Sequence, residues 1–414
     1  MSDTGPGEAK AVSSMNIWKS LRGLPRDVWI LSGATLINRA GTMVLPFLVL
    51  YLTRERGFSA SRAGLALAVY GAGSIIASPI SGRLADRIGP LPIMRASLLG
   101  TGALLLLFPF VHGYPAIIAL TLTWALIAEA FRPANMAMIA DMVPRELLKP
   151  AYALNRLAIN LGMSIGPAAA GFIAAKSFDR IFFVDALTTI VAGLILLMTP
   201  FALAHRKPSE ESPEHSRFRP LVLDDRRMLL FLSALFLTGV VFFQHEGALP
   251  LFLVGDLHLS PAFYGMLFTI NTLMIVVMEV PLNGATAHWP HRNALSLGAL
   301  LFALGSGAFA FARSPAAIIV GIVVWTFGEM LLFPQAAAYV ADIAPPERRG
   351  EYMGAYQLAF SLSFAFAPWA GASGYARFGA RPLWLGVFVI GAISALMMLQ
   401  VTVEKARRVE AAAA

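Results

Sequence analysis

Cysteine is absent from this chain of 414 residues, and charged side chains are scarce. Without cysteine the chain has no disulfide, no thiolate metal ligand and no thiol redox chemistry. Only 14% of the residues are Asp, Glu, Lys or Arg, whereas soluble globular proteins carry about 25%. This shortage leaves little charged surface with which to keep a folded chain in water.

Motifs of catalysis and cofactor binding are also missing. The seven histidines and the acidic residues show no metal-ligand spacing, and no glycine-rich loop ends in Lys-Ser or Lys-Thr, the pattern that binds nucleotide phosphates. No Ser, His and Asp pattern indicates a nucleophile. The formal charge of +8 is not gathered into basic stripes with aromatics. We therefore expect no metal, no cofactor, no nucleic-acid partner and no enzymatic activity.

Long apolar runs dominate the sequence. Hydrophobic residues make up 57% of the chain, and the mean hydropathy is +0.68. A helix needs about 20 apolar residues to cross about 30 Å of hydrocarbon. Runs of that length, bounded by proline, glycine and charged residues, predict an all-α membrane protein with twelve transmembrane helices, at residues 28–52, 61–83, 92–111, 115–142, 149–175, 180–203, 228–254, 262–285, 293–312, 316–343, 350–376 and 382–403.

The predicted helices form two groups of six, separated by a polar stretch rich in proline, serine and charge. We predict five segments: an N-terminal segment (1–27), a six-helix bundle (28–203), a linker (204–227), a second six-helix bundle (228–403) and a tail (404–414). Lys and Arg concentrate in the segments outside the bundles and in those loops that lie on the same side of the membrane as these segments, as is typical of the cytoplasmic side. The pattern predicts a lipid-embedded, multi-pass monomer of the inner (plasma) membrane with both termini cytoplasmic.

The second bundle repeats landmarks of the first at a spacing of 201 residues (325 − 124 for the first pair). The matching pairs are Trp124 and Trp325, Pro133 and Pro334, Asp141 and Asp342, Pro144 and Pro345, Glu146 and Glu347, Pro167 and Pro368, Ser59 and Ser260, and Gly64 and Gly265. Because each copy holds an even number of helices, both lie in the same orientation, as in a parallel repeat. Substrate is then expected between the halves near mid-membrane.

The loop after the second predicted helix carries a family motif. Gly82-Arg83-Leu84-Ala85-Asp86-Arg87-Ile88-Gly89 resembles the signature loop of the major facilitator superfamily. The resemblance extends to the two six-helix halves and implies the twelve-helix major facilitator fold. It implies a cytoplasmic gate in which Asp86 meets the N-terminus of the eleventh helix near Gly350, where a helix dipole favours an anion. The gate residues are Gly82, Arg83, Asp86, Arg87, Gly89 and, at the end of the fourth helix, Asp141.

The fifth predicted helix contains the run from Gly162 to Gly171, with Pro167 near its centre. This run resembles the glycine-proline motif of the antiporter branches of the superfamily. Small residues also let helices approach closely whatever the transport mode. The motif thus favours antiport modestly, and close packing explains it about equally well.

Ionisable residues within the predicted helices are candidates for function, since each costs about 2.5–3.5 kcal/mol or more at a helix centre. Burial favours the neutral form of a carboxylate and a nearby cation favours the charged form, so alternating access can switch protonation. The candidates for proton coupling are Glu129, Glu246, Glu329 and His245. Glu129 also lies three residues before Arg132, so the two alternatively form a structural ion pair.

Two phrases resemble the peptide/proton symporters of the superfamily: Phe131-Arg132-Pro133-Ala134-Asn135 and Gly328-Glu329-Met330-Leu331-Leu332-Phe333-Pro334. The resemblance implies that Arg132 binds a substrate carboxylate and that Glu329 pairs with Arg132 or with a substrate amine. The first helix departs from those symporters, because Asn38-Arg39-Ala40-Gly41 stands where they carry a glutamate-rich coupling motif.

Polar residues that can face a central cavity complete the predicted site. The candidates for binding a small-molecule substrate are Asn38, Arg39, Arg132, Arg156, Asn160, Gln244, Asn271, Trp325 and Glu329. The pattern as a whole predicts a proton-coupled secondary active transporter that works by alternating access, most closely resembling a multidrug-type efflux antiporter. Proton-coupled uptake of peptides or other small zwitterions, and uncoupled facilitation, are the alternatives.

Overall fold

The computed structural model describes residues 23–201, 224–345 and 348–402. The predicted tail lies outside the described residues, as do most of the predicted N-terminal segment and most of the predicted linker. Every regular element in the described part is helical, as the sequence predicts.

The first bundle contains, in chain order, α2 (Arg26–Ala40), α3 (Val44–Arg54), α4 (Ala60–Ile88), α5 (Pro90–Leu107), η1 (Phe108–Phe110), α6 (Tyr114–Ala128), α7 (Phe131–Met142), η2 (Arg145–Leu147), α8 (Leu148–Ala174) and α9 (Asp179–Met198). The second contains α10 (Arg226–Phe242), η4 (Phe243–His245), α11 (Ala248–Leu251), the π-helix η5 (Phe252–Asp256), α12 (Pro261–Thr286), α13 (His291–Ala308), α14 (Pro315–Ile343), α15 (Arg349–Phe378) and α16 (Ala380–Leu399).

Ten helical segments in the described part are long and apolar enough to cross a membrane. The helices α13 and α15 stand at the places of the predicted ninth and eleventh helices and bring the number to twelve. The repeat is visible in local structure as well. Ser59 begins α4 and Ser260 begins α12, and each side chain accepts a hydrogen bond from a free backbone N–H of the first turn. The same cap therefore starts the same helix in both halves.

Three helices that the sequence predicts as continuous are interrupted, between α2 and α3, between α6 and α7, and between α10 and α11. In each, a proline follows four residues after the break and cannot donate to the carbonyl there. The pairs of carbonyl and proline are Thr42 and Pro46, Glu129 and Pro133, and Glu246 and Pro250. The expectation of unbroken helices is corrected at these places, and two of the breaks carry a predicted coupling glutamate.

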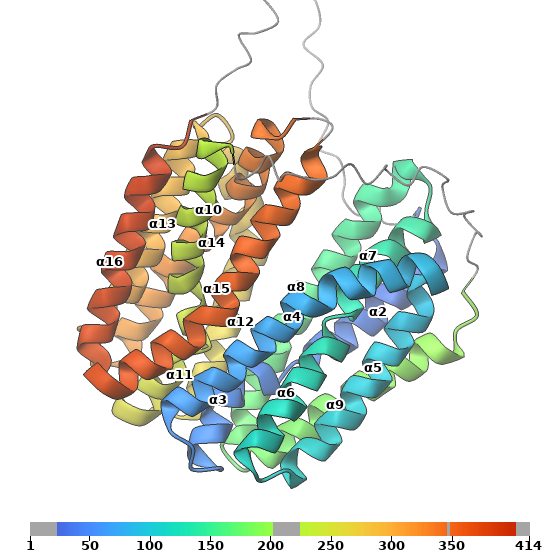
Figure 1. Cartoon of the computed structure of the whole chain (residues 1–414), viewed down its shortest axis with the longest axis horizontal. Coiled ribbons are helices and arrows are strands. Elements are labelled where there is room, and N and C mark those ends of the chain that lie inside the picture. The colour runs from blue at the N-terminus through green and yellow to red at the C-terminus, as the bar shows by residue number, and fades with distance from the viewer. Residues whose placement is uncertain (1–22, 202–223, 346–347, 403–414) are drawn as a thin grey trace, which may run out of the picture.

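The two bundles touch at one end and diverge towards the other (Figure 1). We call the end that carries Arg26 and Leu399 the terminus end, and the opposite end the far end. Contact at the far end depends on paired repeat glycines. A Cβ on Gly64 of α4 would lie 2.8 Å from the carbonyl oxygen of Pro368 in α15, and one on Gly265 of α12 would overlap the backbone of Pro167 in α8.

The predicted gate segment lies at the terminus end, where the bundles are apart. It is not a loop: α4 continues to Ile88, and Gly89 alone separates it from α5. An added Cβ on Gly82, Gly284, Gly350 or Gly354 would meet nothing within 4 Å. Among the residues that the structure describes, the side chains of Arg83, Asp86 and Arg87 form no hydrogen bond or ion pair. The predicted latch between Asp86 and the start of α15 is therefore open in this conformation.

Candidate functional site

A cavity of about 210 Å³ lies mainly within the second bundle. Its walls come from α12, α14 and the interrupted seventh helix, and α8 of the first bundle closes one side. The lining residues are Asn160, Met163, Phe242, His245, Glu246, Leu249, Tyr264, Leu267, Phe268, Asn271, Thr272, Ile275, Ile322, Trp325 and Glu329. The sequence predicted six of them as site residues: Asn160, His245, Glu246, Asn271, Trp325 and Glu329.

Glu246 and His245 stand at the break of the seventh helix. The Nε2 atom of His245 lies 3.6 Å from Oε1 of Glu246, and the Nδ1 atom lies 2.7 Å from the carbonyl oxygen of Phe242. A carbonyl only accepts, so Nδ1 carries the hydrogen and Nε2 of the neutral ring presents a lone pair to the carboxyl group. The approach of Nε2 of His245 to Oε1 of Glu246 is then favourable when one further proton is held between these two atoms. Oε2 of Glu246 is buried without a hydrogen-bond partner among the described residues.

Glu329 reaches the cavity from the middle of α14. Its Oε2 atom accepts a hydrogen bond of 2.7 Å from the Nδ2 atom of Asn271, which also lies 3.1 Å from the hydroxyl of Thr326. Asn271 belongs to α12, so this bond fixes two walls of the cavity to each other. The cavity thus holds two carboxyl groups and one imidazole, while no Lys or Arg is among its described lining residues.

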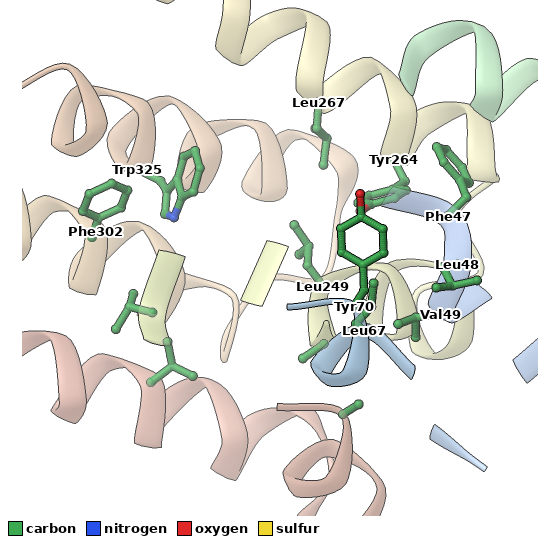
Figure 2. Packing of buried hydrophobic residues seen from close by; sticks show 14 of the residues in the cluster. Phe47, Leu48, Val49, Leu67, Tyr70, Leu249, Tyr264, Leu267, Phe302 and Trp325 are labelled. Atoms are coloured by element: carbon green, nitrogen blue, oxygen red, sulfur yellow. The ribbon is translucent and has the colours of Figure 1, made fainter. Parts of the chain in front are cut away.

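Aromatic rings make up much of the remaining wall. Trp325 and Phe242 stack with ring centroids 5.0 Å apart, and His245 lies 5.7 Å from Trp325 and 5.6 Å from Phe268. Figure 2 shows Trp325 beside Phe302 at one side of this region. Aromatic faces near carboxylates suit a positively charged ligand, because the ring quadrupole attracts cations.

Tyr264 joins the cavity to the first bundle. Its hydroxyl lies 2.9 Å from the carbonyl oxygen of His245 and 3.1 Å from that of Pro46 in α3. Its ring packs edge-on against Phe47 at 5.1 Å, as Figure 2 shows. One residue of α12 therefore touches both the break of the seventh helix and the first helix.

The charged residues predicted in the first bundle form a separate group. Glu129 accepts a hydrogen bond of 3.0 Å from the Tyr70 hydroxyl and lies 3.8 Å from Arg132. The Arg132 side chain is 61% exposed, and the Nε atom of Arg39 is buried with no hydrogen-bond partner in the described part of the chain. None of these residues lines the cavity, so the predicted meeting of Arg132 with Glu329 does not occur in this conformation.

The other predicted binding residues lie elsewhere. Gln244 donates to the carbonyl oxygens of Val240 and Ala367 behind the cavity, and Asn38 donates to Thr189. Arg156 of α8 pairs at 2.6 Å with Glu279 of α12, across the two bundles. No group of three or more His, Asp or Glu side chains within the described ranges is arranged to hold a metal ion.

Sequence reasoning missed Asp185 in α9. The residue is 5% exposed, and its carboxylate accepts bonds of 3.0 Å from the backbone N–H groups of both Met43 and Val44. The signal was present, since an acidic residue lies within an apolar run that predicts a membrane helix. The rule that singled out Glu129 applies equally to Asp185.

Comparison with known proteins agrees with this architecture. The family model of the Major Facilitator Superfamily matches residues 31–255 and 246–414. The chain is 27% identical to the uncharacterized MFS-type transporter YqjV of Bacillus subtilis, over 90% of this chain and 91% of that protein. It is 23% identical to a Na(+), Li(+), K(+)/H(+) antiporter of Planococcus maritimus (82% and 87% covered) and 23% identical to the multidrug resistance protein MdtH of Aeromonas salmonicida (90% and 93% covered).

Among solved structures, a peptide transporter POT in complex with sulfate superposes with a TM-score of 0.76 at 14% identity, covering 94% of this chain and 98% of that one. This likeness concerns the fold alone. The matched family consists of transporters rather than enzymes, and its model covers both helix bundles. The chain belongs to the Major Facilitator Superfamily of multi-pass membrane transporters.

Proposed function

We propose that this transporter exports small organic cations across the inner membrane in exchange for protons, as a multidrug-type efflux antiporter. The observation that carries the proposal is the cavity in which Glu246, Glu329 and His245 face aromatic walls, with no Lys or Arg among the described residues that line it. An ionised carboxylate in a mostly apolar cavity requires a partner of opposite charge. A proton and a cationic substrate are the two partners that an antiporter exchanges.

The aromatic walls favour an organic cation over a bare metal ion. A cation over the face of Trp325 or Phe242 gains about 0.5–2 kcal/mol per favourable contact, and apolar groups attached to the charge gain about 25 cal/mol per Å² buried. A small alkali ion obtains only the carboxylate and amide oxygens. Among the relatives, one is named a multidrug resistance protein and another an alkali-cation/proton antiporter.

Competition for the same carboxyl groups couples the two fluxes. When Glu246 and Glu329 hold protons, the cavity loses its attraction for a cation; when a cation binds, it displaces those protons. His245 extends the proton site, because its Nε2 atom faces Glu246. Glu129 is not among the lining residues and instead bonds to Tyr70, so we assign it to a separate role within the first bundle.

The topology determines which side of the membrane the present conformation faces. With both termini cytoplasmic, as the basic residues predict, the diverging terminus end faces the cytoplasm and the present conformation loads substrate from inside. Closure of the terminus end, where Asp86 lies at the end of α4, then accompanies opening of the far end, where external protons reach the cavity.

Uptake of zwitterionic peptides fits this geometry less well. A zwitterion brings a carboxylate that requires a cationic partner, and Arg39, Arg132 and Arg156 lie outside the cavity lining. Only the amine of such a zwitterion can pair with a charged group of the cavity, either Glu246 or Glu329. An uncoupled facilitator would not need two carboxyl groups and an imidazole in one apolar cavity.

Transport by purified protein in proteoliposomes separates these activities. We expect an outward-directed flux of tetraphenylphosphonium, driven by a proton gradient of opposite direction, that Glu246→Gln and Glu329→Gln abolish. Glu55→Gln serves as the matched control, because Glu55 is exposed and outside the cavity. Proton-driven accumulation of a dipeptide, or transport of tetraphenylphosphonium that is indifferent to the gradient, would overturn the proposal. Gradient-driven flux of Na⁺ without that of the organic cation would assign the site to alkali ions.

A further inference from the structure

The first helix is built from two separate helices with a buried carboxylate at the junction. The helix α2 ends at Ala40, and α3 begins at Val44. The residue before α3, Met43, makes no side-chain cap. The first N–H groups of a helix have no partner within the helix itself. Here Asp185, 142 residues further along the chain, accepts the N–H groups of Met43 and Val44, both at 3.0 Å.

Asp185 is held in place by its own neighbours. Its second oxygen, Oδ1, accepts a hydrogen bond of 3.3 Å from the hydroxyl of Thr189, which in turn accepts one from Asn38 in α2. The carboxylate therefore connects α9 to both pieces of the first helix. A negative charge at the start of a helix is also favoured by the helix dipole, so the arrangement satisfies three donors and the dipole together.

The junction is tightly enclosed. A Cβ on Gly41 would overlap the Thr188 side chain of α9, and Cβ atoms on Gly162 and Gly166 of α8 would press on the backbone between Arg39 and Thr42. The break thus has fixed walls on two sides, while α3 itself extends away from it towards the far end. Rotation of α3 relative to α2 must take place at this point.

The remainder of α3 makes contacts with the second bundle. The carbonyl oxygen of Pro46 lies 3.1 Å from the Tyr264 hydroxyl, Phe47 packs on the Tyr264 ring, and Arg54 donates a bond of 2.9 Å to the carbonyl oxygen of Val254. These contacts belong to the far end, which is closed. Tyr264 also contacts the carbonyl oxygen of His245, at the cavity.

We propose that Asp185 is a positioning residue that sets the far-end gate: by anchoring the start of α3, it holds α3 against α12 and the seventh helix and keeps the far end closed. Loss of the anchor frees α3 to move at the break and shifts the transporter towards the state that is open at the far end. This role does not depend on which substrate occupies the cavity.

A disulfide reporter can read the gate, because the chain contains no native cysteine. The hydroxyls of Ser61 in α4 and Ser373 in α15 lie 2.8 Å apart across the two bundles at the far end. The double variant Ser61→Cys and Ser373→Cys is expected to oxidise readily while the far end is closed. A separate Gly354→Cys variant reports access at the terminus end, since its site has nothing within 4 Å of an added Cβ.

The test combines these reporters with substitutions at the anchor. We expect Asp185→Leu to lower the disulfide yield severalfold and to reduce labelling of the Gly354→Cys site. Asp185→Asn keeps an oxygen that accepts the two N–H groups but removes the charge. Its disulfide yield and its labelling should lie between those of Asp185→Leu and of the parent. Thr199→Val is the matched control, because Thr199 directly follows α9 and, within the described part of the chain, its hydroxyl donates only to the carbonyl oxygen of Ile195.

A merely structural role predicts a different result. Lower thermal stability with the disulfide yield and labelling unchanged would overturn the proposal. If Asp185→Leu does not fold, Asp185→Asn and Thr189→Val decide the matter, and unchanged gate reporters in both folded variants would also overturn it.

Discussion

Replacing Glu329 with Gln tests the assignment of the cavity to cations. The substitution removes one negative charge but keeps an amide oxygen to which Asn271, now 2.7 Å from the carboxylate, can still donate. A cation about 4 Å from a carboxylate gains about 4 kcal/mol at an effective dielectric constant of about 20. Removing one partner of a desolvated charge pair costs about 2–5 kcal/mol.

The lower end of that range applies because Glu246 remains in the cavity. We expect a loss of about 2 kcal/mol, which corresponds to a Kd for tetraphenylphosphonium about 30-fold weaker. Isothermal titration of the purified parent and variant at two pH values measures both the loss of affinity and its dependence on protonation. Affinity of the parent should fall as the pH falls, because protons compete for the carboxyl groups, and the variant should show a weaker dependence.

The control for this prediction is Glu55→Gln, which removes an exposed carboxylate away from the cavity. Its Kd should match that of the parent. A parental Kd and pH dependence in Glu329→Gln would refute the reasoning, since the charge that we hold responsible would then contribute nothing to binding.

Three further predictions concern the scaffold. Gly265→Val should block closure of the far end and abolish transport while Gly284→Val, in the same helix but in open space, transports normally; a flux assay on both checks this. Arg156→Glu should impair transport, and adding Glu279→Arg should restore it, because the ion pair is then re-formed with the charges exchanged. The single substitution should change the unfolding free energy by at most about 1 kcal/mol, because the arginine is largely exposed. Although burial opposes it, hydrogen bonds from two backbone N–H groups at the start of α10 and a nearby guanidinium hold the pKa of Asp225 below its ordinary value of 3.8. The ionised Asp225 carboxylate therefore contributes its full stabilisation of the fold above pH 3.8, and this stabilisation is lost as the pH falls through the lower folded-state pKa. Asp225→Ala should accordingly lower the Tm at neutral pH, and thermal melts at lower pH should show a smaller difference from the parent.

The architecture could be predicted from the sequence because it depends on local signals. Apolar length determines a membrane helix, and the repeat of Ser59 with Ser260 and of Gly64 with Gly265 marks equivalent helix starts and contacts. Helix interruption was less predictable. Pro46, Pro133 and Pro250 follow breaks, whereas Pro167 lies inside an unbroken helix. Neighbouring helices that satisfy or crowd the freed backbone make the difference.

The composition of the site could be predicted only in part. Intramembrane position selected His245, Glu246 and Glu329, and the structure places all three in the lining of one cavity. It could not tell which face Arg132 presents, because helix rotation and the separation of the bundles are not encoded in a local pattern. Asp185 could have been selected by the same rule, but its role could not, because its partners, the N–H groups of Met43 and Val44, become available only through the break in the first helix.

Proton release on substrate binding is the most direct test of cation and proton exchange at one site. Purified protein in a weakly buffered solution is mixed with tetraphenylphosphonium, and the change in pH is recorded. We predict that binding releases protons from the parent and that the double variant Glu246→Gln with Glu329→Gln releases none. Binding of the cation without proton release by the parent would contradict the account.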